Sequence, residues 1–299
     1  MTRIGIDFGG TKIEAAALDS SGRICARTRV PNPGNYADAV HAVCSLVHDM
    51  EKLLGCPCTV GVGGPGSVDP VSGVMRNCST VWLNGHRFRE DLERALGRAV
   101  RLANDANCLA LSESVDGAGR GARTVFAVIL GTGCGGGIVV DGQLLEGANG
   151  IAGEWGHLTL PWPKADEYPG PQCWCGRNSC IETWVSGTGV ARDHLVRTTR
   201  SLTAESIVQA AQRGDSEALL TLDRFIDRLG RALAMICNLF DPDVFVLGGG
   251  LSNVSELYDL LPQSIRPYVF GQSWQARLLP AAWGDSSGVR GAARLWPPV

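Results

Sequence analysis

The sequence lacks a basic surface, an uninterrupted apolar run and an apolar leader. Its 27 Lys and Arg residues against 30 Asp and Glu leave a formal net charge of −3, which offers no basic face for nucleic acid or an anionic membrane. Its longest apolar stretch, residues 124–140, contains five glycines and is not expected to span a membrane. The expected strand at Arg3 begins without a charged and then apolar leader before it, so we expect a cytoplasmic protein.

A disulfide framework is not expected either, although the chain has 11 cysteines. Six of them stand singly among apolar neighbours, as buried reduced thiols usually do: Cys25, Cys44, Cys78, Cys108, Cys134 and Cys237. Cys56 and Cys58 form a close pair without two further ligands nearby, which favours a structural role before a strand.

A zinc site is indicated by four residues at metal-ligand spacing: His157, Cys173, Cys175 and Cys180. Three thiolates and one imidazole complete a tetrahedral shell with no open position, so this zinc would be structural. His157 could instead be a catalytic base, but a metal-bound imidazole cannot also take up a proton, which favours the ligand role. Glu154 and Glu182 flank the cluster. They are either surface charges or, because carboxylates accept several hydrogen bonds from hydroxyl groups, ligands for a sugar.

A pattern of strand, glycine turn with threonine, strand, tight turn and strand occurs twice. The first copy covers residues 3–7, 13–18 and 23–30, and the second covers 124–130, 135–140 and 143–145. Helices follow each copy, among them an amphipathic one whose apolar residues from Val40 to Leu54 step by three and four. We therefore expect two similar α/β lobes with a cleft between them, residues 1–118 and 119–285, and a C-terminal helix at about 286–299 that packs back on the first lobe.

Both glycine turns are suited to binding phosphate. In the first, Gly9 and Gly10 allow several backbone N–H groups to point at one anion. Thr11 and Lys12 add a hydroxyl group and a positive charge, and Asp7 at the end of the strand could hold Mg²⁺ through water. The second turn repeats this device with four residues: Gly131, Thr132, Gly133 and Gly135. A plain β-hairpin is the alternative for either turn alone. Neither is a P-loop or a Rossmann fingerprint, because strands rather than helices follow them.

Asn104 and Asp105 lie where an expected strand passes into a helix. A helix N-cap, which Asn and Asp both favour, explains one of the two residues. The other reading makes Asp105 a general base that takes the proton of an alcohol attacking a phosphoryl group. Position alone leaves both readings open.

Six motifs in this order resemble the ROK family of sugar kinases: DFGGTK at 7–12, LANDAN at 102–107, GTG at 131–133, GEWGH at 153–157, CWCG with CIE at 173–182, and GGG at 248–250. Within the family, residues 77–85 and 284–293 most resemble the bacterial fructokinase and mannokinase branch. The resemblance implies an actin-like, ribonuclease H-like ATPase fold of two lobes with ATP and Mg²⁺ in a central cleft. It also implies a homodimer.

The resemblance assigns roles to individual residues. Asp105 matches the catalytic base. Further positions match sugar contacts: Gly66, Ser67, Asn84, Asn104, Asp105, Glu154, His157 and Glu182. The nucleotide positions are Asp7, Gly9, Gly10, Thr11, Lys12, Gly131, Thr132, Gly133, Gly135, Gly248, Gly249 and Gly250. His157 doubles as a ligand of a structural zinc ion, with Cys173, Cys175 and Cys180.

The implied activity is ATP-dependent phosphorylation of the 6-hydroxyl of a hexose, with D-fructose expected first and mannose or glucose as further substrates. N-acetylglucosamine, N-acetylmannosamine and glucose kinases of the same family are the alternatives, since they share most of these motifs. Trp82 could narrow the space that an N-acetyl group needs, or it could be buried core. A sugar-responsive repressor is disfavoured, because no residues before Arg3 are left for a helix-turn-helix domain. A chaperone-like actin relative is disfavoured by the sugar and zinc residues.

Two positions depart from the family pattern. Ser179 stands where glycine is expected before Cys180, and a turn that needs a positive φ would be strained by serine. Gly64 stands where relatives often have isoleucine, which changes the packing expected at the floor of the sugar pocket.

Overall fold

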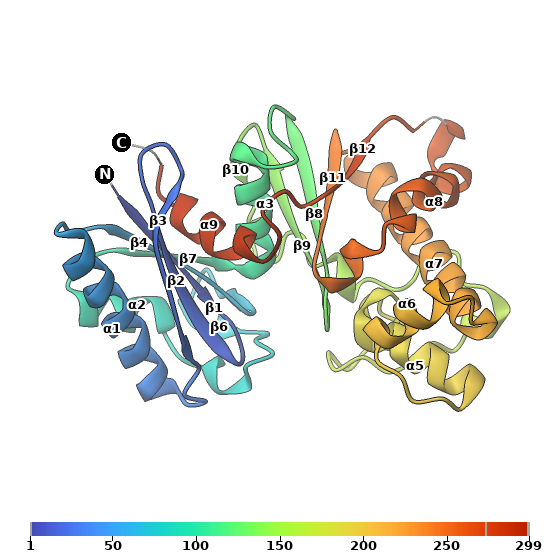
Figure 1. The fold of residues 1–299 in the computed structure, drawn as a ribbon, viewed down its shortest axis with the longest axis horizontal. Coiled ribbons are helices and arrows are strands. Elements are labelled where there is room, and N and C mark those ends of the chain that lie inside the picture. Colours follow the sequence, from blue (N-terminus) through green and yellow to red (C-terminus); the bar gives the residue numbers. More distant parts are fainter. Residues whose placement is uncertain (1, 273, 298–299) are drawn as a thin grey trace. The chain divides into compact units, whose positions relative to one another are not determined.

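The structure, a computed structural model, describes residues 2–272 and 274–297. The chain divides into two compact units (Figure 1). The first unit comprises Met1–Arg120, Gly137–Ala152 and Ala282–Val299, and the second comprises Gly121–Gly136 and Gly153–Ala281. No helix in the described part of the chain is both long enough and apolar enough to cross a membrane.

The first unit is built on a five-stranded sheet. Its strands are β1 (Arg3–Phe8), β2 (Lys12–Leu18), β3 (Ile24–Pro31), β4 (Thr59–Gly64) and β7 (Val100–Asn104), in the order β3-β2-β1-β4-β7. β1 is antiparallel to β2 and parallel to β4, and β4 is parallel to β7. The carboxyl ends of β1, β4 and β7 therefore lie on the same side of the sheet. The first glycine turn follows β1 there, and Gly64 and Asn104 are the last residues of β4 and β7.

Helices cover both faces of this sheet. Alternation along β1 turns Ile4, Ile6 and Phe8 to one face, where they share a core with α1 (Tyr36–Leu54) and α2 (Phe88–Leu96). On the other face Gly5 and Gly61 lie against α9 (Ser287–Arg294), and a Cβ on either would come within 1.9 Å of a carbonyl oxygen of this helix. Glycine at these positions lets the backbone of α9 rest directly on the sheet (Figure 1).

Three further elements of the first unit lie next to the sheet: a hairpin, a 3₁₀ turn and a helix. A two-stranded hairpin joins β5 (Ser67–Val68) to β6 (Met75–Arg76), and a 3₁₀ turn follows at Val81–Leu83. α3 (Asp105–Asp116) begins directly after β7 and packs against α9, where Gly291 lies so close to Cys108 that no side chain would fit between them. This start of α3 is the element that presents Asp105.

A second five-stranded sheet repeats the first. Its strands are β8 (Thr124–Leu130), β9 (Cys134–Val140), β10 (Gln143–Leu144), β11 (Val244–Gly248) and β12 (Arg277–Pro280), in the order β10-β9-β8-β11-β12. Each sheet thus has its first three strands in reverse order, followed by two later strands parallel to the first. This internal repeat confirms the α/β duplication predicted from the two glycine turns.

The helices of the second unit follow the zinc-ligand segment. They are α4 (Glu182–Val185), α5 (Gly187–Thr198), α6 (Ala204–Gln212), α7 (Ser216–Phe240) and α8 (Glu256–Ile265). α7 buries Arg228 and Arg231 together with Glu167, whose carboxylate accepts hydrogen bonds from both guanidinium groups at 2.8–2.9 Å. This buried ionic cluster fastens the segment between His157 and Cys173 to α7.

Most elements lie within a few residues of their predicted positions. The hairpin of β5 and β6, the edge strand β12 and helix α8 were missed. Strands of two to four residues are too short to show a clear alternation, and α8 contains Pro262. One cysteine prediction is wrong: Cys25 is exposed rather than buried, because it lies on β3 at the edge of the first sheet. In the close pair, Cys58 is buried and Cys56 is exposed.

Candidate functional site

The first glycine turn joins β1 to β2. Gly9 donates its N–H to the carbonyl oxygen of Lys12 at 3.0 Å, which closes the hairpin. Asn32 braces it from the end of β3, donating Nδ2 to the oxygen of Gly9 at 2.8 Å and its N–H to the oxygen of Thr11 at 2.9 Å. Gly10, Thr11 and Lys12 are exposed, so their polar groups are accessible to a ligand. The hairpin reading and the anion-binding reading are therefore compatible.

Asp7 and Asp105 interact electrostatically beside this turn. Burial, together with the negative charges of Asp105 and Glu14, raises the pKa of Asp7 to about 6. The N-terminus of α9 lies against Asp7, since a Cβ on Gly288 would be 3.4 Å from its Cγ. A buried carboxylate whose ionisation is disfavoured by a neighbouring carboxylate is suited to Mg²⁺, which takes oxygen ligands and would neutralise part of this charge.

Asn104 is the N-cap of α3. Its Oδ1 accepts the N–H of Ala106 at 2.8 Å, and its Nδ2 donates to the carbonyl oxygen of Gly66 at 3.0 Å. The capping alternative thus accounts for Asn104, while Asp105, the exposed first residue of α3, also accepts the N–H of Ala106 through Oδ1, at 2.7 Å. Asn104 also ties the loop of Gly66 to the helix that carries Asp105.

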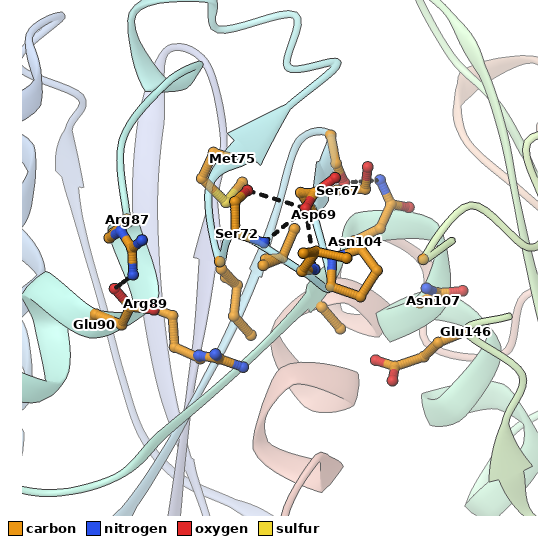
Figure 2. Close-up of a pocket in the computed structure, with 18 of the residues that line it drawn as sticks. Ser67, Asp69, Ser72, Met75, Arg87, Arg89, Glu90, Asn104, Asn107 and Glu146 are labelled. Carbon is orange, nitrogen blue, oxygen red and sulfur yellow. Dashed lines mark hydrogen bonds and ion pairs between the residues drawn. The ribbon is translucent and has the colours of Figure 1, made fainter. Parts of the chain in front are cut away.

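A polar cavity of about 410 Å³ opens in the first unit (Figure 2). Three predicted sugar contacts line it: Gly66, Ser67 and Asn104. Residues that the sequence did not single out also line it, among them Arg89, Asn107 and Glu146. Asn107 lies in the LANDAN motif, but nothing in the sequence separated it from an ordinary helix residue. Its Oδ1 and the Ser67 hydroxyl are buried without a hydrogen-bond partner in the described part of the chain.

Asn84 closes the loop that follows β6. Its Oδ1 accepts the N–H of Cys78 at 2.9 Å, and its Nδ2 donates to the oxygen of the same residue at 3.2 Å. Trp82, inside this loop, packs its ring edge-to-face on Phe8 with centroids 6.0 Å apart, and it does not line the cavity. Of the two readings of Trp82, core packing is the one observed. A Cβ at Gly64 would lie 3.7 Å from the Cβ of Phe8, which is an ordinary van der Waals contact, so the backbone there does not require glycine on grounds of space.

The second unit brings the second glycine turn and the GGG motif together. Gly131 donates to the oxygen of Gly133 at 3.1 Å. Gly249 has a φ of 83°, and a Cβ there would lie 2.6 Å from the backbone of Leu130, so only glycine allows this approach. The two segments border a largely apolar cavity of about 850 Å³, lined by Gly131, Thr132, Gly250 and residues of α5 and α6. Its size and lining suit a nucleoside beside phosphate-binding turns.

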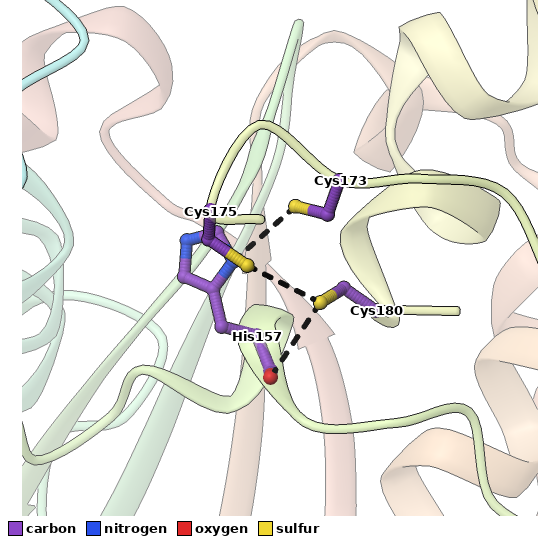
Figure 3. Close-up of side chains that lie close together, drawn as sticks. All are labelled: His157, Cys173, Cys175 and Cys180. Carbon is purple, nitrogen blue, oxygen red and sulfur yellow. Dashed lines mark hydrogen bonds between the residues drawn. The ribbon is translucent and has the colours of Figure 1, made fainter. Parts of the chain in front are cut away.

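The four predicted zinc ligands converge in the second unit (Figure 3). Their ligand atoms all lie within 4.8 Å of one another. Cys173 Sγ is 3.7 Å from His157 Nδ1, and Cys175 Sγ is 3.6 Å from Cys180 Sγ. These separations match the edge of a tetrahedron of bonds of about 2.3 Å, which is about 3.8 Å. The residues therefore fit a closed zinc site in which His157 uses Nδ1.

Ser179 adopts the positive φ expected for the glycine of the motif. Its φ is 61°, and the turn is held by its N–H bonded to the oxygen of Pro171 at 2.8 Å. Its side chain lies against Gly170, where a Cβ would come within 2.3 Å of Ser179 Oγ. The absence of a side chain at position 170 makes room for serine at 179, so the ligand spacing is kept.

Both glutamates that flank the zinc ligands contact the motif residues. Glu154 places Oε2 at 4.0 Å from His157 Nε2, the ring nitrogen that faces away from the thiols. Burial raises the pKa of Glu154. Glu182 accepts the N–H of Cys134 at 3.0 Å and the indole N–H of Trp174 at 2.7 Å. Glu182 therefore touches both the second glycine turn and the zinc loop.

Comparison with known proteins agrees with these motifs. A model of the ROK family matches residues 3–298. The chain is 40% identical over 298 residues to an N-acetyl-D-glucosamine kinase of Pectobacterium atrosepticum, with 97% of each chain covered. Its fold is similar to a ROK hexokinase from Thermus thermophilus, with a TM-score of 0.87, 34% identity and coverage of 98% and 97%. It is also similar to a ROK glucokinase from Streptomyces griseus in complex with glucose and AMPPNP, with a TM-score of 0.80, 31% identity and 99% coverage of each chain.

Proposed function

Since the chain belongs to the ROK family of sugar kinases, with an actin-like ATPase fold, we propose that it transfers the γ-phosphoryl group of ATP to the 6-hydroxyl of N-acetyl-D-glucosamine. The observation that carries the chemistry is the pair of Asp7 and Asp105 beside an accessible glycine turn. In this proposal the two compact units correspond to the two lobes expected from the sequence.

The choice of sugar rests on relatives rather than on the cavity. The curated relative compared above is an N-acetyl-D-glucosamine kinase, and an equally full match to one of Vibrio cholerae is 38% identical. The expectation of D-fructose, drawn from the resemblance of residues 77–85 and 284–293, receives no such support. The steric argument against an N-acetyl group also loses its basis, because Trp82 packs on Phe8 instead of lining the cavity.

Asp105 is the proposed general base. Its carboxylate at the start of α3 accepts the proton of the 6-hydroxyl as that oxygen attacks phosphorus, a contribution of about 10²–10⁴-fold. Asp7 would hold Mg²⁺, which would neutralise charge on the phosphates of ATP. The amides of the two glycine turns, with Thr11 and Lys12, position these phosphates, while the apolar cavity beside Gly250 takes the adenosine.

Sugar binding is assigned to the residues predicted for it. Gly66, Ser67 and Asn104 border the polar cavity of the first unit, and Asn84 supports the neighbouring loop. In the second unit Glu154 and Glu182 are proposed to accept hydrogen bonds from sugar hydroxyls, and His157 is proposed to donate one from Nε2, with the zinc ion holding their loop in place. A homodimer remains a prediction, which the mass of the protein in solution would test.

The test is a screen of ADP release with five sugars: N-acetyl-D-glucosamine, N-acetylmannosamine, glucose, mannose and fructose. We expect the highest kcat/KM for N-acetyl-D-glucosamine, by about tenfold over glucose, since one well-placed hydrogen-bonded group contributes about 1.4 kcal/mol or more. Asp105→Asn, which keeps the size of the side chain, is expected to lower kcat at least about 100-fold with its circular dichroism unchanged. Fructose as the best substrate, or near-normal turnover of Asp105→Asn, would contradict the proposal.

A further inference from the structure

Glu182 lies between two parts of the second unit that are treated separately above. One carboxylate oxygen, Oε2, accepts the N–H of Cys134 at 3.0 Å, at the end of the second glycine turn. The other, Oε1, accepts the indole N–H of Trp174 at 2.7 Å, and Trp174 stands between the zinc ligands Cys173 and Cys175. We propose that Glu182 couples zinc occupancy to nucleotide affinity, by holding the second glycine turn in place only while the zinc loop holds Trp174.

The zinc side of this link depends on the metal. Trp174 is at the tip of a small loop closed by Cys173 donating to the oxygen of Arg177 at 2.7 Å and Gly176 donating to the oxygen of Cys173 at 3.0 Å. The indole itself is 61% exposed, and its ring meets His157 edge-to-face with centroids 5.0 Å apart. Little apolar burial holds it. When Cys173, Cys175 and His157 bind one ion, both neighbours of Trp174 and its ring partner are fixed, and so is the indole N–H.

The nucleotide side of this link is equally close. Gly133 has no space for a side chain, since a Cβ there would lie 2.8 Å from Glu182 Oε2. The turn that Glu182 supports begins at Gly131 and Thr132, which line the cavity assigned to the nucleotide. Two further contacts hold this turn: Gly187 donates to the oxygen of Gly131 at 2.8 Å, and Thr188 Oγ1 donates to the oxygen of Thr132 at 3.0 Å. Loss of the Glu182 contact should therefore weaken the turn without abolishing it.

The direction of the effect follows from linkage. If zinc raises the affinity for nucleotide by some factor, nucleotide must raise the affinity for zinc by the same factor. The Glu182 carboxylate is held in one rotamer while it accepts from both the Trp174 indole and the Cys134 amide. Without the indole N–H, the Glu182 side chain can rotate away from the Cys134 amide. The inference rests on the proposed function, because it takes the 850 Å³ cavity as the nucleotide site.

The experiment measures the dissociation constant of AMPPNP with Mg²⁺ by calorimetry, on zinc-loaded protein and on chelator-treated protein. We expect affinity about 5–10-fold weaker without zinc. Trp174→Phe keeps all four zinc ligands and removes only the indole N–H. It should retain about one zinc per chain by metal analysis, yet bind AMPPNP as weakly as the zinc-free wild type. Trp162→Phe, at a 45% exposed tryptophan elsewhere in the second unit, is the matched control and should behave as wild type.

The outcomes are distinguishable. Equal AMPPNP affinity of zinc-loaded and zinc-free wild type overturns the inference, and so does zinc-loaded Trp174→Phe that binds as tightly as Trp162→Phe. Should the zinc-free protein unfold, the comparison of the two zinc-loaded variants still decides. Absence of AMPPNP binding in every zinc-loaded form contradicts the proposed function itself.

Discussion

Asn104 joins Gly66 to the start of α3. Its Nδ2 donates to the carbonyl oxygen of Gly66 at 3.0 Å, while its Oδ1 caps the helix through the N–H of Ala106 at 2.8 Å. One side chain thus positions both the loop that borders the polar cavity and the helix residue Asp105. Two substitutions can separate these two contributions.

Asn104→Ala is expected to lower the free energy of unfolding by about 1 kcal/mol, because it removes the N-cap of α3. Asn104→Ser keeps a capping hydroxyl but cannot reach Gly66, so it should retain near wild-type stability. Both variants should raise the KM for the sugar, since both release the loop of Gly66. Urea unfolding and steady-state kinetics check this. A wild-type KM in Asn104→Ser would show that the contact with Gly66 does not position the sugar site.

Asp7→Asn is expected to be more stable than the wild type at pH 7.5, yet inactive. The folded-state pKa of Asp7 is raised from 3.8 to about 6, so the folded state binds this proton more tightly than the unfolded state. The ionised carboxylate therefore destabilises the fold as the pH rises from about 4 to above 6, by up to about 3 kcal/mol. Urea unfolding between pH 4 and 8, without Mg²⁺ or nucleotide, measures the difference.

The same comparison has an internal control. The stability gain of Asp7→Asn should be small near pH 4, where Asp7 is protonated in the folded state and only about half ionised in the unfolded state. The gain should also shrink at pH 7.5 when Mg²⁺ and ADP are added, because only the wild type keeps the carboxylate. A gain that is constant from pH 4 to 8 would show that the substitution acts through packing rather than charge.

Glu167→Gln is expected to destabilise the second unit by about 3 kcal/mol at pH 7, because it removes the buried carboxylate that Arg228 and Arg231 share. Arg228 would keep only Asp193 as a partner, and Arg231 only Asp227. Burial alone would raise the pKa of Glu167, but hydrogen bonds from Arg231, the Lys164 N–H and Arg228 lower it to about 2. The stabilisation is therefore present above about pH 4.5 and is lost as the pH falls towards 2.

Unfolding of the wild type and Glu167→Gln between pH 2.5 and 7 measures this dependence, and the two curves should converge at acid pH. Glu217→Gln, at an exposed ion pair with Arg197, is the control and should cost less than about 1 kcal/mol. Parallel curves at all pH values would contradict a charge-dependent role of Glu167.

Gly170→Ala is expected to cost about 1–3 kcal/mol, because the new methyl group would overlap the side chain of Ser179. Ser179→Gly alone should lower stability by about 1 kcal/mol, since it removes the acceptor of the buried Trp184 indole N–H, while relief of the positive φ offsets the added freedom of the unfolded chain. The double variant should recover part of the loss, though not all of it, because the Cα of residue 179 would still lie 2.7 Å from the new Cβ. Thermal unfolding with zinc analysis checks the cycle, and strictly additive effects would show that the two positions do not interact.

The sequence was informative where residue type alone restricts structure. Three cysteines and a histidine at ligand spacing have few alternatives, so the convergence of His157 with Cys173, Cys175 and Cys180 was predictable. The repeated glycine turns predicted the duplicated sheets for the same reason. The capping alternative for Asn104 could also be stated in advance, but only the structure assigned the cap to Asn104 rather than Asp105.

Relationships between distant polar side chains could not be predicted. Glu182 accepts hydrogen bonds from the Trp174 indole and the Cys134 N–H. Nothing in the neighbouring sequence distinguishes it from a glutamate that faces solvent. Trp82 carried two readings because an aromatic residue in a loop can face either a pocket or a core, and only its contact with Phe8 separates them. Arg89, Asn107 and Glu146 also line the polar cavity. They could not be predicted as lining residues because they come from three separate segments of the chain.

The packing of α9 on Gly5 and Gly61 has a consequence for biosynthesis. β1 and β4 precede the second unit in the chain, whereas α9, which covers one face of these strands, follows it. During translation the first sheet must wait, with this face uncovered, while the whole second unit is synthesised. The order in which the two units mature should therefore be the reverse of their order along the messenger RNA, and chaperones that bind nascent chains would meet the N-terminal sheet for most of that interval.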